Sequence, residues 1–315
     1  MDITAKQAAE ILKNSGNEYR IIYHIRPDGD AICSAYALAE ALHMLGKKCA
    51  VMSHGRIPSV YSGYAESFGN DDMAEPLNVV VDSASPARIG GFADEKIFLS
   101  VDHHMPNTIA AEYKYTDEES SSCGELVYKV IKELGVGITP HIAELIFTAL
   151  LTDTFCFRSG SVNAESYKAA AELACCGIDV SGIARRHYMN KSPQRAKIEE
   201  IFVRSYHYTC GGKVLGGIIT REDMRVSGID PCELEGITSF PEEISGVLAG
   251  ITIRETADGR SRVSVHTSDG INAADICGIF GGGGHAHAAG CELDCAPDEA
   301  LKIIEKTCAE MINSK

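Results

Sequence analysis

Several features are missing from this 315-residue sequence, and each absence excludes a class of protein. No apolar run is long enough to span a membrane, and the first residues lack the basic-then-apolar order of a signal peptide. The twelve cysteines contain no Cys-x-x-Cys pair, which argues against structural zinc and favours reduced, buried thiols. We therefore expect a cytoplasmic protein without a membrane anchor.

Basic charge is also scarce. The chain has 29 Lys and Arg residues against 44 Asp and Glu residues, for a net charge of −15. A protein that binds long nucleic acid carries a basic surface, so we expect no binding to long duplexes. One basic run, from Arg185 to Lys197, is interpreted as a solvated helix face or linker rather than a phosphate-binding patch.

The order of apolar segments predicts an α/β protein with two domains. Short apolar strands alternate with helical patterns in the first part of the chain, which is typical of a mostly parallel, doubly wound sheet. The predicted strands there are 20–23, 49–52, 77–81 and 97–101, and the predicted helices are 31–45, 122–134 and 140–152. Strands at 214–220, 245–255 and 262–266 predict a smaller C-terminal α/β domain. We expect domains at 1–188 and 206–315, joined by a linker helix at 189–205, with a cleft between them.

Three of the predicted strands end in residues that can ligate a metal. His24 follows the first strand, Asp82 the third and Asp102 the fourth. Because the carboxyl ends of parallel strands meet at one edge of a sheet, we expect these side chains to lie together.

Further acids and imidazoles lie beside these three positions in the sequence, namely Asp28, Asp30, His103, His104 and Asp153. Each residue has a structural explanation of its own, such as helix capping for Asp30 or a buried core position for His104. All of these separate explanations would have to be correct at the same time to account for the whole set without a metal. Oxygen and imidazole ligands without thiolate suit Mn²⁺ or Mg²⁺, with Zn²⁺ and Fe²⁺ as alternatives. The number of carboxylates favours two ions about 3.5–4 Å apart, as in enzymes that hydrolyse phosphoesters.

A run of four glycines, Gly281 to Gly284, precedes His285. Consecutive glycines allow backbone N–H groups to converge on an anion, and the histidine would add a donor. A flexible turn before an edge strand explains the same residues, and the sequence does not decide between the two.

These segments together resemble a known family. The motifs, in chain order, are His24-x-x-Pro27-Asp28-Gly29-Asp30, Val81-Asp82-Ser83, Asp102-His103-His104 with Asn107, Thr152-Asp153-Thr154, and GGGGHAHAAG from Gly281 to Gly290. The chain resembles the DHH phosphoesterases of the nano-RNase and pAp phosphatase type, with the DHH-associated C-terminal domain. The resemblance covers nearly the whole length.

The resemblance implies a role for each motif residue. His24, Asp28 and Asp82 would bind one Mn²⁺, and Asp30, Asp82, His103 and Asp153 the other, with Mg²⁺ as the alternative metal. Asp102 would orient a ligand histidine, and His104 would face the substrate phosphate and protonate the leaving oxygen. A hydroxide bridging the ions would be the nucleophile. Substrate contacts would come from Gly282, Gly283, Gly284, His285, His266 and Asn107.

The implied activity is hydrolysis of short oligoribonucleotides or linear dinucleotides such as pApA, together with pAp to AMP. The alternatives are a c-di-AMP phosphodiesterase and, in another class, a catalytically weak nucleotide-binding sensor. RecJ-like exonuclease action and family II pyrophosphatase action are disfavoured. The resemblance is also compatible with a homodimer.

One position departs from the resemblance. Many relatives carry an arginine where this chain has His266. Arginine is a permanent bidentate phosphate ligand, whereas histidine titrates near pH 6.5. We therefore expect weaker or more pH-sensitive substrate binding, or a shifted substrate preference.

Overall fold

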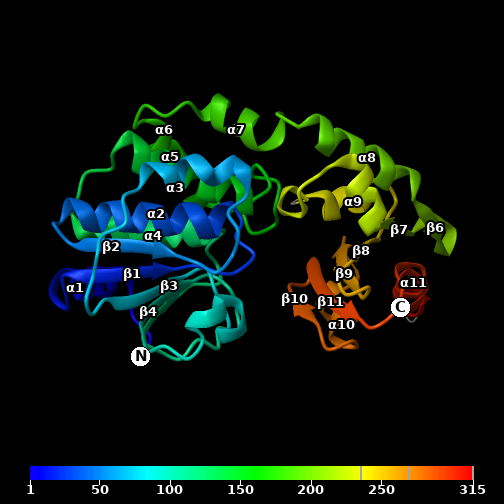
Figure 1. The fold of residues 1–315 in the computed structure, drawn as a ribbon, viewed down its shortest axis with the longest axis horizontal. Helices are drawn as coiled ribbons and strands as arrows, with labels where there is room; N and C mark the ends of the chain where they lie inside the picture. Colours follow the sequence, from blue (N-terminus) through cyan, green and yellow to red (C-terminus); the bar gives the residue numbers. More distant parts are fainter. Residues whose placement is uncertain (235, 269, 314–315) are drawn as a thin grey trace. The chain divides into compact units, whose positions relative to one another are not determined.

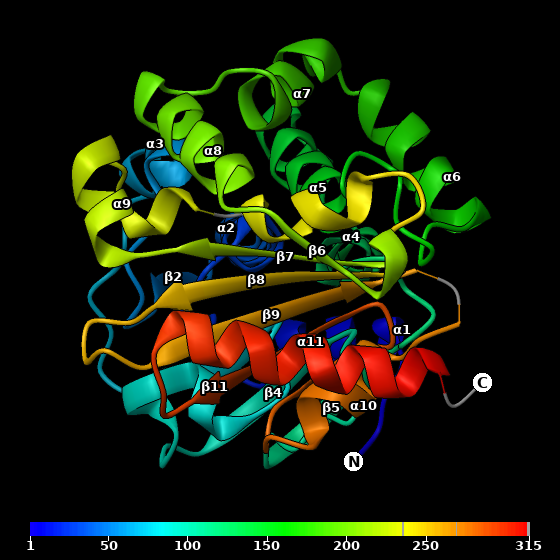
Figure 2. The same ribbon diagram turned by 90° about the vertical axis from the view of Figure 1, so that its right-hand side faces the viewer.

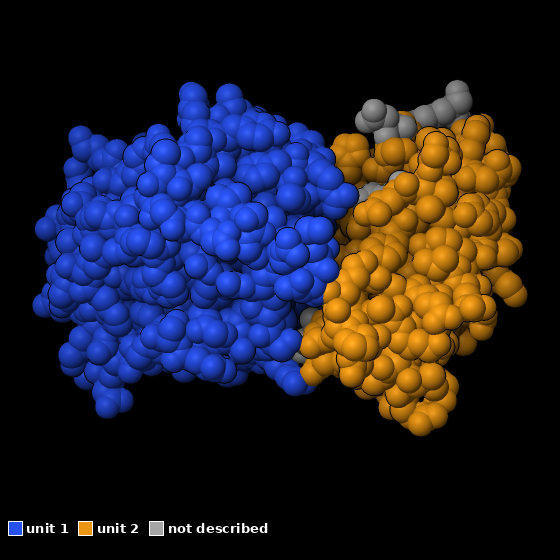
Figure 3. Space-filling view, turned by 90° about the horizontal axis from the view of Figure 1, so that it is seen from above, with its two compact units in different colours: residues 1–190 blue, residues 191–315 orange. Residues whose placement is uncertain are grey.

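The computed structural model describes residues 1–234, 236–268 and 270–313. The chain divides into two compact units, unit 1 (residues 1–190) and unit 2 (residues 191–315), which are coloured separately in Figure 3. No helix in the described ranges is both long enough and apolar enough to cross a membrane.

Unit 1 is built on a five-stranded parallel sheet with the order β2-β1-β3-β4-β5. The strands are β1 (Glu18–Ile22), β2 (Lys48–Met52), β3 (Leu77–Val81), β4 (Ile97–Asp102) and β5 (Ala111–Thr116). The helices are α1 (Ala5–Asn14), α2 (Gly29–Met44), α3 (Ser62–Ser67), α4 (Cys123–Leu134), α5 (Pro140–Asp153), α6 (Ala164–Ala174) and α7 (Val180–Tyr188). The predicted parallel α/β architecture is confirmed.

Both faces of this sheet are buried. Successive strand residues point to opposite faces, so Ile21 joins the large core under α2, α4 and α5, whereas Ile22 joins a smaller cluster with Ile89 and Phe92. Figure 1 shows α2 and α5 together over one face of the sheet. The short 3₁₀ segment at Pro86–Phe92 covers the other. Burial on both faces explains why the central strands are rich in apolar residues instead of alternating between apolar and polar ones.

Local sequence patterns missed part of unit 1. Strand β5 lies at an edge and has the charged residues Glu112 and Lys114 within it, so it does not form an apolar run. Helix α2 begins at Gly29, and its N-cap is Asp28, whose carboxylate accepts the N–H of Ala31 at 3.0 Å. The capping role considered for Asp30 is therefore wrong, because Asp28 takes it.

Unit 2 contains a six-stranded mixed sheet with the order β10-β11-β9-β8-β7-β6, in which only the β7–β8 pair is parallel among the pairs described. The strands are β6 (His207–Thr209), β7 (Val214–Ile219), β8 (Ala249–Glu255), β9 (Ser261–Thr267), β10 (Gly283–Gly284) and β11 (Ala288–Leu293). The helices are α8 (Pro193–Arg204), α9 (Arg221–Ser227), α10 (Ala273–Gly278) and α11 (Pro297–Asn313). Figure 2 shows α11 lying along this sheet.

Two apolar clusters hold unit 2 together. Residues of β8 and β9 such as Ile251 and Val265 pack with α10 and α11. Helix α8, which falls in the range expected to link the domains, packs Ile198 and Phe202 against Ile219 of β7. Its apolar side is therefore part of the core of unit 2.

Candidate metal centre

The carboxyl ends of three neighbouring strands deliver the candidate ligands. Asp82 directly follows β3, Asp102 is the last residue of β4, and His24 lies just beyond β1. Because β1, β3 and β4 are adjacent in the sheet, these residues meet at one edge. Asp153, the last residue of α5, reaches the same place, because its carboxylate and that of Asp82 each lie 3.6 Å from Nε2 of His103.

The first group of side chains surrounds His24. Its Nε2 atom lies 3.5 Å from Oδ2 of Asp28 and 3.4 Å from Oδ2 of Asp82. The ligand atoms of the three residues all lie within 4.8 Å of one another, close enough to hold one ion.

The second group surrounds His103. Its Nε2 atom lies 3.8 Å from Oδ2 of Asp30, 3.6 Å from Oδ1 of Asp82 and 3.6 Å from Oδ2 of Asp153. The two oxygens of Asp82 face different groups: Oδ2 lies toward His24, whereas Oδ1 lies 3.6 Å from Nε2 of His103 and 3.5 Å from Nδ1 of His104. The ligand atoms of Asp82, His103 and His104 lie within 4.8 Å of one another, as do those of Asp30, His103 and Asp153. Asp82 is placed as a side chain that two ions would share.

These distances suit shared cations better than hydrogen bonds. Separations of 3.4–3.8 Å exceed hydrogen-bond length. They lie at or slightly above the roughly 3.0–3.4 Å that separates two ligands about 2.1 Å from one ion at octahedral or tetrahedral angles. Among the described residues, both ring nitrogens of His24, Nε2 of His103 and Oδ1 of Asp82 are buried without a hydrogen-bond partner. Buried polar atoms seldom lack partners, so the residues fit two divalent cations.

The tautomer of His103 supports the same fit. Its Nδ1 atom lies 3.2 Å from the carbonyl oxygen of Ser120, which can only accept a hydrogen bond. With the proton on Nδ1, the lone pair of Nε2 faces the carboxylates, as in most histidines that ligate metals.

The electrostatics of the cluster favour positive charge. Burial and the nearby carboxylates of Asp82 and Asp153 raise the pKa of Asp30 well above its usual range. Burial likewise raises the pKa of Asp153 to about 6. Although burial acts against it, the carboxylates of Asp28 and Asp82 raise the pKa of His24 to about 9. A bound cation would offset the repulsion among these carboxylates and favour their charged forms.

Asp30 is held by a part of the fold that the sequence does not reveal. Its carboxylate accepts the backbone N–H groups of Cys123 at 2.7 Å and Gly124 at 2.8 Å, at the N-terminus of α4. It also accepts the hydroxyl of Ser34 at 3.1 Å. A Cβ atom at Gly124 would lie 2.5 Å from that of Ala149, so a glycine is required there. The helix N-terminus stabilises the negative charge.

The backbone of Asp82 is in an unusual conformation. Its φ angle of 51° lies in the left-handed region, which costs free energy for residues other than glycine, although aspartate tolerates it better than most. Such strain persists where the surroundings enforce it, often at functional sites. The surrounding fold therefore holds Asp82 in this conformation.

Asp102 and His104 form a pair beside the metal ligands. Nδ1 of His104 lies 2.8 Å from Oδ1 of Asp102, and the side-chain amide of Asn107 donates to Oδ2 of Asp102 at 2.7 Å. Burial opposes it, but Asp102 and Asp82 raise the pKa of His104 to about 9. These carboxylates favour the charged form of His104, and the fully buried Asp102 orients its ring.

The side chain of Asn107 is engaged at both ends. Its NH₂ group donates to Asp102, and its oxygen accepts the N–H of Ile109 at 3.0 Å. This arrangement favours a role in positioning Asp102 over the direct substrate contact that the sequence resemblance implies.

The glycine run of unit 2 forms a hairpin. Gly283 and Gly284 pair with Gly290 and Ala289 as β10 and β11. A Cβ at Gly282 would lie 2.2 Å from the carbonyl oxygen of Gly290, and one at Gly284 would lie 2.5 Å from that of Ala288. The glycines therefore serve the close approach of two chain segments.

This hairpin leaves fewer backbone N–H groups for the predicted anion-binding site. The N–H groups of Gly281, Gly282 and His285 donate to backbone carbonyl oxygens of unit 2, so they are not available to an anion. His266 lies on β9, between Gly250 of β8 and Ala288 of β11. The predicted substrate contacts of His266, His285 and the glycines stay predictions.

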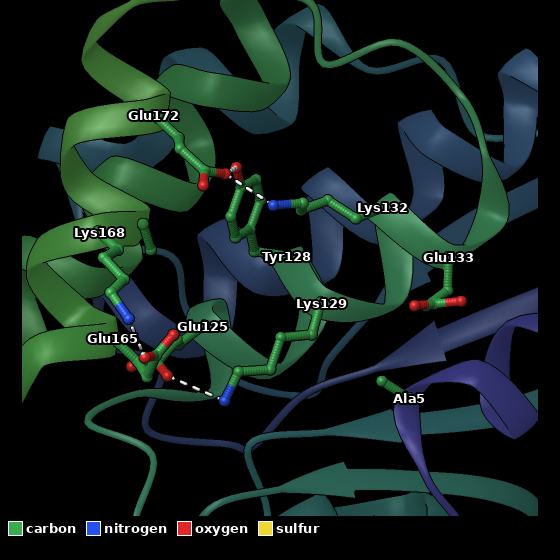
Figure 4. A pocket seen from close by; sticks show the side chains of 10 residues that line it. Ala5, Glu125, Tyr128, Lys129, Lys132, Glu133, Glu165, Lys168 and Glu172 are labelled. Atoms are coloured by element: carbon green, nitrogen blue, oxygen red, sulfur yellow. Dashed lines mark hydrogen bonds and ion pairs between the residues drawn. The ribbon is translucent and has the colours of Figure 1, made fainter.

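A separate pocket of about 300 Å³ opens between α4 and α6 and contains none of the candidate metal ligands. Figure 4 shows that its cations face its acids. Lys132 lies 2.7 Å from Glu172, Lys168 lies 2.6 Å from Glu165, and Lys129 lies 2.9 Å from the buried Glu125. Only the Lys132–Glu172 pair joins the two helices, whereas each of the other pairs lies within one helix. Because these cations are paired with acids of the same pocket, its lining favours a structural role over a ligand site.

Comparison with known proteins identifies the family. The DHH family N-terminal domain matches residues 18–150, and the DHHA1 domain matches residues 222–310. The chain is 27% identical over 309 residues to a bifunctional oligoribonuclease and PAP phosphatase of Thermus thermophilus, covering 95% of this chain and 92% of that protein. A probable manganese-dependent inorganic pyrophosphatase of Enterococcus faecalis is 31% identical over 166 residues, which is 48% of this chain and 53% of that protein.

A solved structure shares the fold. The crystal structure of an exopolyphosphatase-related protein from Bacteroides fragilis superimposes with a TM-score of 0.84 and 24% identity, covering 96% of this chain and 95% of that one. Together, the two matched domains account for both units of the molecule. The chain belongs to the DHH family of phosphoesterases, with the DHH N-terminal domain in unit 1 and the DHHA1 domain in unit 2.

Proposed function

We propose that this protein is a two-metal phosphoesterase that hydrolyses short oligoribonucleotides and linear dinucleotides such as pApA, and that it also converts PAP to AMP. The observation that carries the proposal is the position of Asp82, whose two carboxylate oxygens face two separate groups of candidate ligands. His24 and Asp28 complete the first group, and Asp30, His103 and Asp153 complete the second.

The metals suit this reaction. Two divalent cations in such a site lower the pKa of a water molecule and neutralise the charge of the phosphate. Mn²⁺ is the first choice, supported by the oxygen and imidazole donors and by the similarity to a probable manganese-dependent pyrophosphatase. Mg²⁺ is the alternative.

His104 acts as the proton donor in this proposal. Asp102 accepts a hydrogen bond from Nδ1 of His104, so the ring is held in one orientation and its charged form is stabilised. A charged imidazole beside the metal ligands can protonate the leaving oxygen. Asp102 and Asn107 are positioning residues that act through His104.

The substrate class follows from the relatives and from the charge of the chain. The full-length relative of Thermus thermophilus is named for action on oligoribonucleotides and PAP, and it covers nearly the whole of this chain. With a net charge of −15, the protein is poorly suited to hold a long polyanion. A short substrate whose charge is neutralised by metal ions is more compatible with this surface.

Turnover of PAP, pApA, a five-nucleotide RNA and c-di-AMP, measured side by side with Mn²⁺, tests the proposal. We expect cleavage of pApA, the short RNA and PAP, and its loss in the His104→Ala variant. Cleavage of c-di-AMP alone would assign the protein to cyclic dinucleotides instead. Binding of nucleotides without turnover of any of them would identify a sensor.

A further inference from the structure

The turn after Asp153 contains three consecutive non-glycine residues in the left-handed region. The φ angles of Phe155, Cys156 and Phe157 are 47°, 62° and 61°. L-amino acids avoid this region because Cβ approaches the backbone, and runs of such residues are very uncommon. Strain of this kind often accompanies a functional site.

Hydrogen bonds hold the turn in this conformation. The buried hydroxyl of Thr154 donates to the carbonyl oxygen of Leu150 at 2.6 Å and accepts the N–H of Phe157 at 3.0 Å. The N–H of Cys156 donates to Leu151 at 2.8 Å, and the N–H of Arg158 donates to Thr154 at 2.8 Å. The end of α5 therefore fixes the backbone that follows Asp153.

The turn places its two phenylalanines in different environments. The ring of Phe157 lies against Phe147 and Tyr167, with centroids 6.2 and 5.4 Å away, and packs against the core of unit 1. Phe155, by contrast, is 40% exposed. Burial of the ring explains why a phenylalanine occupies position 157, but it explains the phenylalanine at position 155 only weakly. Glycine at position 155 would adopt the same backbone conformation without strain.

Phe155 also lies close to the candidate metal centre. It is two residues from Asp153, so the two Cα atoms are separated by at most about 7.6 Å. The carboxylate of Asp153 lies 3.6 Å from Nε2 of His103. An exposed aromatic residue therefore lies within two positions of a candidate ligand, on a backbone segment that is held by hydrogen bonds to the end of α5.

We propose that Phe155 forms a nucleobase subsite, in which its ring stacks on the base next to the phosphate bound at the metal centre. This inference rests on the proposed function and narrows it to substrates that carry a nucleobase. Stacking of a base on an aromatic side chain is tolerant of sequence, because every base has a π-face. Inorganic pyrophosphate or polyphosphate would gain nothing from the ring.

Binding of AMP and ribose 5-phosphate, which differ only by the base, tests this subsite. Affinities are measured by titration calorimetry on the full chain with Mn²⁺ present. We expect the wild-type protein to bind AMP about 5- to 150-fold more tightly than ribose 5-phosphate, the range that stacking on one aromatic ring typically provides. In Phe155→Leu this ratio falls close to one because the affinity for AMP drops. The affinity for ribose 5-phosphate stays unchanged.

Two further variants separate stacking from folding. Phe155→Tyr retains the ring and should keep the ratio, whereas Tyr208→Leu, which removes an exposed aromatic side chain of unit 2, should leave it unaltered. Phe155→Gly should lose the ratio as Phe155→Ala does, yet melt about 2–4 °C higher than Phe155→Ala, because glycine accepts a positive φ. Equal melting temperatures would contradict the strain on which the inference depends.

Equal binding of AMP and ribose 5-phosphate by the wild-type protein, or an equal loss of both in Phe155→Leu, would overturn the subsite. The proposed function fails on a different observation, which is the absence of hydrolysis of pApA, short RNA and PAP. The binding ratio is measured without turnover, so the two failures are distinguishable.

Discussion

The two units use their motif residues in opposite ways. In unit 1 the motifs supply side chains, since His24, Asp82 and His103 bring buried nitrogen and oxygen atoms together at the edge of a parallel sheet. In unit 2 the glycine motif supplies backbone geometry, since Gly282 and Gly284 permit a contact that any side chain would block. The motifs of unit 1 therefore act through the chemistry of their side chains, whereas the glycine motif of unit 2 acts by allowing two backbone segments to approach closely.

This difference has an energetic consequence. Burying carboxylates beside one another destabilises a protein unless a cation compensates for their charge. We therefore expect the stability of unit 1 to depend on bound cations. The hairpin of unit 2 is satisfied by its own backbone hydrogen bonds. We expect substitutions in the two motifs to differ in their dependence on metal.

The largest effect is expected from Asp82→Asn. An amide cannot serve two cations as a carboxylate does, so we expect turnover of pApA to fall on the order of 10³-fold or more, with less than two ions bound per chain. Without metal, the same variant should melt higher than the wild-type protein, because one of the mutually repelling carboxylates is gone. Turnover, metal analysis and thermal melts with and without EDTA measure these effects.

Asp117 provides the matched control. It follows β5 at the same edge of the sheet but belongs to none of the candidate metal groups. Asp117→Asn should keep its metal content and most of its turnover. If Asp82→Asn behaves like this control, Asp82 is not a shared ligand.

The next largest effect is a difference in stability between substitutions of two neighbouring glycines of unit 2, Gly283 and Gly284. Gly284→Ala places Cβ 2.5 Å from the carbonyl oxygen of Ala288, whereas a Cβ at Gly283 meets nothing within 4 Å. We expect Gly284→Ala to destabilise unit 2 by about 1–3 kcal/mol and Gly283→Ala to be tolerated. Both variants should retain full metal binding. Chemical denaturation provides the comparison, and equal destabilisation by both would contradict the hairpin.

A pH-dependent effect is expected from His187, which stacks on Tyr61 at 5.2 Å and whose Nε2 has no hydrogen-bond partner within the described part of the chain. Burial and the nearby Arg186 lower the pKa of His187 from 6.5 to about 4. The neutral form is therefore favoured by folding, and the stability present above pH 6.5 is lost as the pH falls toward 4.

His187→Phe removes this titration. The variant should gain about 1–2 kcal/mol of stability relative to wild type on going from pH 8 to pH 5. Urea denaturation at the two pH values measures the gain. A difference that does not change with pH would show that His187 titrates normally.

The smallest effect concerns His266 on β9. If this side chain contacts a substrate phosphate, His266→Arg should lower the KM for pApA about fivefold at pH 8, because arginine stays charged and binds phosphate through two donors. The pH dependence of KM should become flatter. An unaltered KM and pH profile would remove His266 from the substrate site.

The sequence predicted the centre of unit 1 well because several signals coincide there. The strands ending at Ile22, Val81 and Asp102 are buried on both faces, so they are rich in apolar residues. Each has a residue that can ligate metal at or just beyond its carboxyl end. Asp28, Asp30, His103 and Asp153 were also expected at the site, and the structure brings all four close to the strand ends.

Other features had no local signal. The N–H groups that hold Asp30 come from Cys123 and Gly124, more than 90 positions away, and no residue pattern connects the two segments. The left-handed turn beginning at Phe155 uses residue types that do not indicate a positive φ. The glycine run left two alternatives open, because only the pairing of β10 with β11 reveals what the glycines accommodate.

The most direct test of the central claim is anomalous diffraction at the manganese edge from crystals of the full chain grown with Mn²⁺. We expect two ions on opposite sides of the Asp82 carboxylate, one contacting His24 and Asp28 and the other contacting Asp30, His103 and Asp153. A single ion, or ions bound away from Asp82, would contradict it.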